Sequence, residues 1–130
     1  MTGRRKSCSG DQTVILIADD EVLIRSVARI ALEKEGYHTL ACQDGEEALH
    51  ISRSFPGTIH AVLSDVKMPK VNGLELREQI LAERPGIKVL LMSSQTDSTV
   101  PSNVEFLPKP FGPAVLQDRM RQLLASPASV

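Results

Sequence analysis

The chain has 130 residues, of which 42% are hydrophobic and 24% are charged, and its formal net charge is -1. This length suits one domain with its own core, and the nearly balanced charge gives no reason to expect direct binding to nucleic acid or to a membrane surface. No apolar run approaches the roughly 18 residues of a membrane-spanning helix and no signal sequence is evident, so we expect a cytoplasmic protein.

The ends of the chain differ in composition from its middle. Residues 1–12 are rich in Gly, Ser and basic side chains and have no periodic apolar pattern, which predicts a disordered leader. We assign residues 13–126 to a single domain and residues 127–130 to a tail. Cys8 falls in the leader and Cys42 reads as a small core residue, so we expect no disulfide framework.

The domain begins with a strand and a helix. Residues 13–18 form a nearly continuous aliphatic run, which is typical of a central strand in a parallel sheet. Three acidic residues follow it: Asp19, Asp20 and Glu21. In the next segment the apolar residues recur at helical spacing, which predicts a buried helix face made of Leu23, Val27, Ile30 and Ala31. Gly36 stands just past that helix, where many helices end.

A second strand and helix come next. The strand is expected over residues 39–42, and the helix over residues 44–54. Asp44 is placed as its N-cap, with Glu47 three residues later as in a capping box. Pro56 and Gly57 end this helix.

The third strand is a short apolar run that ends at Asp65. Because turn-forming residues bound it on both sides, this strand is expected to be buried on both faces. A helix is predicted over residues 73–84, with Leu76 and Ile80 facing the core.

Two more strands and one helix complete the domain. The strands are expected over residues 87–92 and 104–107, with Ser93 and Lys109 just beyond them. The polar segment 94–103 contains a proline and has no apolar stripe, so it has room for about one helical turn. We expect it to be a mobile loop. The last helix, over residues 113–125, has an apolar side made of Val115, Leu116, Met120, Leu123 and Leu124.

The regular alternation of strand and helix predicts a parallel sheet with helices on both faces. We therefore expect an α/β fold, a flavodoxin-like three-layer sandwich. Its five-stranded parallel sheet would have the order 2-1-3-4-5, and its fourth helix would be shortened or missing. The first and third strands would then be neighbours at the switch point of the sheet.

Acidic side chains should converge at that switch point. Asp19, Asp20 and Asp65 follow or end the two neighbouring strands, and three close carboxylates repel one another unless a cation lies among them. Oxygen ligands with no His or Cys nearby favour a hard ion, and Mg²⁺ is the natural candidate. A lone aspartate here would more simply cap the first helix.

Ser93 and Lys109 add a hydroxyl and an ammonium group at the ends of the fourth and fifth strands. Taken singly, each is ordinary surface or turn chemistry. Together with the acidic cluster they are typical of a phosphoryl-transfer site, which works by positioning and by charge neutralisation.

These motifs resemble the receiver domain of two-component response regulators. The resemblance covers about residues 13–125 and rests on four segments in the family's order: Ile17–Glu21, Asp65–Gly73, Ser93–Ser94 and Lys109–Phe111. Asn72 stands where the family usually has an aspartate, and the polar segment 94–103 stands where the family has a full fourth helix.

The resemblance implies that Asp65 is the phosphoacceptor and takes its phosphoryl group from a phosphohistidine. The donor would be a sensor histidine kinase or a histidine phosphotransfer protein. Asp19, Asp20, Asp65 and the backbone carbonyl of Lys67 would bind Mg²⁺, and Lys109 would bind a phosphoryl oxygen.

The resemblance also places Ser93 and Phe106 at the positions that switch on activation. Lys67 and Gln95 fall at positions that tune hydrolysis of the phosphoryl group in this family. The implied protein is a signalling domain that catalyses its own phosphorylation and dephosphorylation. It would not be an enzyme with an external substrate, and we expect a monomer or weak dimer.

Three other functions fit parts of the sequence. A non-phosphorylated interaction module could share the fold. A phosphatase of the haloacid-dehalogenase type also has an aspartyl nucleophile, but places it after the first strand in an Asp-x-Asp pattern and carries a capping insertion. A flavin-binding module would need aromatic side chains to stack on its cofactor, and the chain has few.

Overall fold

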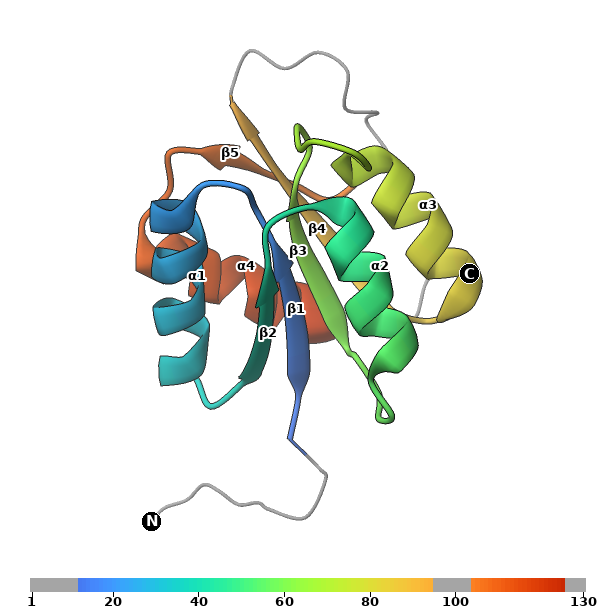
Figure 1. Ribbon diagram of the computed structural model, residues 1–130. Helices are drawn as coiled ribbons and strands as arrows, with labels where there is room; N and C mark the ends of the chain where they lie inside the picture. Colours follow the sequence, from blue (N-terminus) through green and yellow to red (C-terminus); the bar gives the residue numbers. More distant parts are fainter. Residues whose placement is uncertain (1–11, 95–103, 126–130) are drawn as a thin grey trace.

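A computed structural model describes residues 12–94 and 104–125 (Figure 1). Apart from Gln12, the expected leader lies outside the described residues, as do the expected tail and most of the segment in which the fourth helix was expected to be shortened. Of the helices in the described ranges, none combines the length and apolar character needed to cross a bilayer.

Strands and helices alternate through residues 14–94, as predicted, and a further strand and helix follow from residue 106. The elements in order are β1 (Val14–Ala18), α1 (Val22–Lys34), β2 (His38–Cys42), α2 (Gly45–Ser54), β3 (Ala61–Asp65), α3 (Gly73–Glu83), β4 (Lys88–Ser94), β5 (Phe106–Lys109) and α4 (Pro113–Ala125). The five-stranded sheet has the order β2-β1-β3-β4-β5 and all its pairs are parallel, which confirms the predicted topology. Helices α1 and α4 cover one face of the sheet, and α2 and α3 cover the other (Figure 1).

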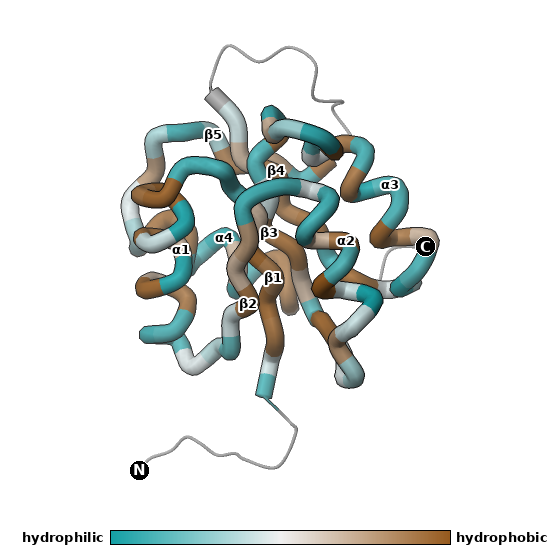
Figure 2. Tube along the Cα trace, viewed as in Figure 1, coloured by the Kyte–Doolittle hydropathy of each residue, from teal (hydrophilic) through white to brown (hydrophobic). Residues whose placement is uncertain are grey.

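The core consists of two apolar layers, one on each side of the sheet. Alternate residues of each central strand enter opposite layers, so that Leu16 packs toward α2 and α3 while Ile17 packs toward α1 and α4. Figure 2 shows the hydrophobic strands in the middle of the molecule. Cys42 is buried, as expected, and burial raises the pKa of its thiol to about 12.

The predicted core face of α1 was wrong. The buried residues of this helix are Ala28, Ala31 and Leu32. Leu23 and Ile30 are instead 78% and 56% exposed. The sequence holds two apolar stripes about a third of a turn apart, and the one with small residues lets the helix approach the sheet closely. Ala31 was the single correct member of the predicted face.

The predicted caps were partly right. The side chain of Asp44 accepts a hydrogen bond from the backbone N–H of Glu47 at 2.8 Å, which confirms the N-cap of α2. The carboxylate of Glu47 accepts from the N–H of Gln43, so the capping box does not close on Asp44 itself. A complete capping box forms at α3 instead, between Asn72 and Glu75, and α3 buries Leu76 and Ile80 as predicted.

The last two strands differ slightly from their predicted bounds. β4 continues through Ser94, and β5 begins two residues later than expected, so that it ends at Lys109 and pairs Lys109 with Ser94. An edge strand tolerates the proline within it. On α4 the expected apolar face is buried at Leu116, Met120 and Leu123 and half-buried at Leu124. Val115 was wrongly placed on this face, because it is 49% exposed.

Arg84 joins the ends of two helices on one face of the sheet. It is the C-cap residue of α3, and its guanidinium donates hydrogen bonds to the carbonyls of Ser52, Phe55 and Gly57 at 2.6, 3.2 and 3.0 Å. Its Nε also donates to the hydroxyl of the buried Ser52 at 2.8 Å. The guanidinium group therefore supplies hydrogen-bond donors to backbone carbonyls at and just beyond the C-terminal end of α2.

Replacing Arg84 by Met should destabilise the fold by about 2 kcal/mol, because it keeps the apolar stem but leaves these acceptors without their charged donor. Urea unfolding measures the change. The matched control is Arg53→Met, which removes only the exposed ion pair with Glu83 and should have a much smaller effect. Equal losses in the two variants would contradict this role of Arg84.

Candidate functional site

Two carboxylates meet where β1 and β3 end side by side. Ala18, the last residue of β1, pairs with Ser64, so the next residue along each strand, Asp19 and Asp65, stands at the same carboxyl edge of the sheet. Asp19 is fully buried and Asp65 is 8% exposed. The sequence predicted this meeting correctly.

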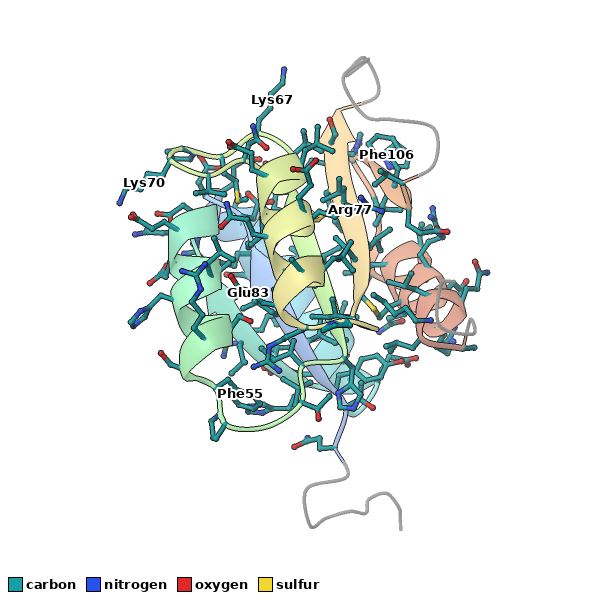
Figure 3. All side chains as sticks on the ribbon, turned by 90° about the vertical axis from the view of Figure 1, so that its right-hand side faces the viewer. Phe55, Lys67, Lys70, Arg77, Glu83 and Phe106 are labelled. Atoms are coloured by element: carbon teal, nitrogen blue, oxygen red, sulfur yellow. The ribbon has the colours of Figure 1, made fainter. Side chains whose placement is uncertain are left out.

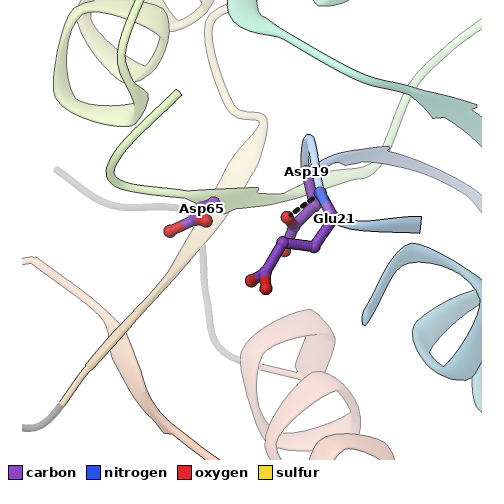
Figure 4. A group of neighbouring side chains, drawn as sticks. All are labelled: Asp19, Glu21 and Asp65. Atoms are coloured by element: carbon purple, nitrogen blue, oxygen red, sulfur yellow. Dashed lines mark hydrogen bonds between the residues drawn. The ribbon is translucent and has the colours of Figure 1, made fainter. Parts of the chain in front are cut away.

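Glu21 is the third acidic residue of the cluster. The carboxylate oxygens of Asp19, Glu21 and Asp65 lie within 4.8 Å of one another (Figure 4). Glu21 is brought in by a tight turn, in which its backbone N–H donates to Asp19 Oδ1 at 2.8 Å. The sequence analysis assigned no role to Glu21. Its only signal was a third consecutive acidic residue, and the turn that directs it inward could not be foreseen.

Asp20 was expected to converge with Asp19 and Asp65, but it lies outside the group of three carboxylates, in which Glu21 takes part instead. It is exposed and lines a depression beside the loop between β3 and α3, a loop that contains Lys67 and Asn72. Asp20 therefore approaches the site from the side of the β3–α3 loop, while Glu21 approaches from the side of Lys109.

The ammonium group of Lys109 lies among the three clustered carboxylates. Its Nζ is 3.0 Å from Asp65 Oδ2 and 3.3 Å from both Asp19 Oδ2 and Glu21 Oε1. Burial alone would lower the pKa of Lys109, but its hydrogen bond to Asp65 and the charge of Asp19 raise that pKa above its ordinary value. The side chain of Lys109 is therefore a fixed positive charge.

Burial raises the pKa of Asp19, against the opposing effects of the Glu21 N–H and of Lys109. When the cluster is fully ionised, three carboxylates face a single ammonium group. The excess negative charge, held by oxygen donors alone, fits a hard divalent cation such as Mg²⁺.

The backbone around Asp65 is held by several hydrogen bonds. The hydroxyl of Ser64 donates to the Asp65 carbonyl at 2.9 Å, and the N–H of Lys67 donates to Asp65 Oδ1 at 3.3 Å. The N–H of Gly73 donates to the Val66 carbonyl at 2.8 Å. A Cβ at Gly73 would lie 2.3 Å from the Asp65 carbonyl oxygen, so only glycine lets α3 begin this close to the acidic site.

The remaining predicted residues come from β4 and β5. Ser93 is buried and follows Met92, the residue that pairs with Asp65, so it stands at the same edge of the sheet. Phe106 is half-buried and pairs with Leu91 (Figure 3). Gln95 lies outside the described residues.

Comparison with known proteins gives a consistent result. The family described as "Response regulator receiver domain" matches residues 15–121. Response regulator RR06 of Streptococcus pneumoniae is 34% identical over 85% of this chain and 52% of its own length. Sensor kinase CckA of Brucella abortus is 31% identical over 89% of this chain but only 13% of its own length.

Among solved structures, the receiver domain from the hybrid histidine kinase CckA is similar, with a TM-score of 0.75 and 37% identity. The match covers 85% of this chain and 98% of that one. The chain thus spans about half of RR06 and a small part of the sensor kinase from Brucella, while it corresponds to nearly the whole of the isolated domain.

Asp19→Asn tests the cost of the buried charge. Because burial raises the pKa of Asp19, the folded protein holds this proton more tightly than the unfolded chain does. Stability is therefore lost as the pH rises through the folded-state pKa. Without divalent cations at pH 7, the variant should melt several degrees higher than the wild type, as measured by circular dichroism.

This difference should shrink as the pH falls toward the ordinary aspartate value of about 4, where Asp19 is itself protonated. Asp118→Asn, at an exposed position on α4, is the matched control and should show little change. A lower melting temperature for Asp19→Asn at pH 7 would mean that pairing with Lys109 outweighs the cost of burial.

Proposed function

The chain belongs to the response regulator receiver domain family of two-component signalling, and we propose that its phosphoacceptor is Asp65. The donor is a phosphohistidine on a sensor histidine kinase or on a histidine phosphotransfer protein. The observation that carries this proposal is the position of Asp65, at the carboxyl end of β3 and 3.0 Å from the ammonium group of Lys109. Receiver domains of this family interact with histidine kinases.

In the proposed transfer, a carboxylate oxygen of Asp65 forms a bond to phosphorus. The bond from phosphorus to the imidazole nitrogen breaks, and the imidazole keeps that electron pair. Lys109 then pairs with an oxygen of the transferred group instead of with the Asp65 carboxylate. The fixed charge and partial burial of Lys109 support this role, because a positive group already in place needs little rearrangement during the reaction.

Asp19, Asp20, Asp65 and the backbone carbonyl of Lys67 are the proposed Mg²⁺ ligands. When bound, Mg²⁺ neutralises the charge on the phosphoryl oxygens. The excess of carboxylates over ammonium groups in the acidic cluster supports the presence of a divalent cation. The exposed Asp20 flanks the same site across the depression beside the β3–α3 loop.

Ser93 and Phe106 are the proposed switch residues. Ser93 follows Met92, the residue of β4 that pairs with Asp65. Its hydroxyl donor therefore stands at the edge of the sheet where a phosphoryl group on Asp65 would lie. The same site would carry out both phosphorylation and hydrolysis of the aspartyl phosphate, so the domain acts on itself. A cytoplasmic location and a monomeric or weakly dimeric state belong to this proposal.

The exposed apolar stripe of α1, made of Leu23, Val27 and Ile30, is the proposed docking surface for the phosphodonor. Figure 2 shows hydrophobic stretches along this helix. α1 begins at Val22, directly after Glu21 of the acidic cluster, so a helical partner seated on the stripe would hold its histidine near Asp65. An exposed apolar stripe that adjoins a reactive site is typical of a protein interaction surface.

Intact mass spectrometry tests the acceptor. After incubation with Mg²⁺ and acetyl phosphate, the wild type should gain one phosphoryl group, and this gain should disappear without Mg²⁺ and in Asp65→Asn. Asp118→Asn, which alters an exposed aspartate on α4, should be phosphorylated like the wild type. An adduct that persists in Asp65→Asn would identify another acceptor, and no adduct at all would favour a non-phosphorylated interaction module.

A double substitution, Leu23→Ala with Ile30→Ala, tests the docking surface. With a phosphorylated histidine kinase that transfers to the wild type, we expect transfer to fall about tenfold, because truncating two apolar contact residues costs roughly 1 kcal/mol or more. Phosphorylation by acetyl phosphate, which needs no docking surface, should be unchanged. Equal transfer from the kinase to both proteins would exclude the α1 stripe as the docking surface.

A further inference from the structure

The loop between β3 and α3 is packed tightly against the first residue of α2. A Cβ added to the buried Gly45 would lie 2.2 Å from the backbone oxygen of Val71 and 2.7 Å from its Cβ. No side chain fits in this contact. In the part of the chain that the structure describes, the positive-φ glycines are Gly36 and Gly86. The close approach of the two backbones therefore explains the glycine at position 45, whereas backbone conformation does not.

Lys70, in the same part of the loop, forms ion pairs with the amino end of α2. Its Nζ lies 3.4 Å from a carboxylate oxygen of Glu46 and 3.9 Å from one of Asp44, both at the amino end of α2. Its backbone has a φ of 71°, a left-handed conformation that costs energy for a residue other than glycine. Figure 3 shows Lys70 and Lys67 projecting from this loop in different directions.

The loop is also held at its beginning, next to the acidic site. The N–H of Lys67 donates to Asp65 Oδ1, and the N–H of Gly73 donates to the carbonyl of Val66. The short stretch between these contacts and Val71 contains the backbone carbonyl of Lys67. A displacement at Val71 therefore has few residues over which to relax before it reaches this carbonyl.

We propose that the amino end of α2 is a clamp that sets the position of the Lys67 carbonyl, and that Gly45 and Lys70 thereby control the affinity of the site for Mg²⁺. Neither residue belongs to the acidic cluster, so both are positioning residues. The proposal rests on the proposed function, because it takes the Lys67 carbonyl as a metal ligand. It assigns a role in metal binding to a helix end that carries none of the reacting groups.

Gly45→Ala tests the steric contact. Because Val71 must move, we expect the dissociation constant for Mg²⁺ to rise about tenfold, the scale typical of residues that support metal ligands. Isothermal titration calorimetry measures it with Mg²⁺ alone, and the backbone amide signal of Lys67 in NMR spectra should shift. At saturating Mg²⁺, phosphorylation by acetyl phosphate should return to the wild-type rate. A purely structural role would lower the melting temperature without changing the Mg²⁺ dependence.

Gly57→Ala is the matched control at the far end of α2. The atoms nearest to its added Cβ would be those of the Phe55 ring, the first at 3.2 Å, and the Mg²⁺ affinity should not change. An unchanged dissociation constant in a folded Gly45→Ala protein would overturn the clamp.

Lys70→Gln provides a second test that does not overpack the structure, because this side chain is 62% exposed. Removing a positive charge near a cation site should by itself tighten Mg²⁺ binding, whereas loss of the clamp should weaken it by about twofold to fivefold, the scale of an exposed ion pair. The control Lys67→Gln removes the same charge from an outward-pointing side chain and should bind Mg²⁺ more tightly. Tighter binding by both variants would contradict the role of Lys70.

The two levels of proposal fail in different ways. If the wild type binds no Mg²⁺ and gains no phosphoryl group, the proposed function is wrong, and the proposed role of Gly45 and Lys70 in Mg²⁺ binding is wrong as well. If the wild type does both, and a folded Gly45→Ala protein retains its affinity, only the clamp is wrong.

Discussion

The ammonium group of Lys109 determines how the acidic site of this protein is built. It lies within 3.3 Å of oxygens from Asp19, Glu21 and Asp65, so one cation holds three carboxylates together at the edge of the sheet. One positive charge does not balance three negative ones. Burial raises the pKa of Asp19, and the nearby charge of Asp65 raises it further. The fold thus keeps a poorly neutralised group of charges in place, which is what a site for a divalent cation and a phosphoryl group requires.

The parallel sheet is what allows those charges to meet. Four of the five strands, β1, β3, β4 and β5, each bring one candidate site residue to the same edge, and the two core layers on either side hold the strands in register. Close backbone contacts then set the loops: α3 begins against the carbonyl of Asp65 at Gly73, and α2 begins against Val71 at Gly45. Both contacts require a residue without a Cβ. The loop that contains Lys67 is therefore positioned by helix ends as well as by the acidic cluster.

The orientation of α1 links the site to the proposed docking surface. This helix packs on the sheet through Ala28, Ala31 and Leu32 and leaves Leu23 and Ile30 exposed to solvent. Small residues at the contact bring the helix close to the sheet, and the larger apolar residues become available outside it. Since the same helix follows directly after Glu21, the exposed stripe and the acidic cluster are neighbours along the chain.

The order of residues in the chain was sufficient to predict the strand order, the meeting of Asp19 with Asp65, and the presence of Lys109 at their edge, because alternating strand and helix patterns leave few possible topologies. The side of α1 that faces the core, the inward turn of Glu21 and the contact at Gly45 were not foreseen. The first and the last depend on how closely two packed segments approach, and the position of Glu21 depends on a tight turn and on its ion pair with Lys109. Periodicity carries no information about such distances. Local patterns therefore predicted which elements form, and packing between distant segments selected which side chains they present.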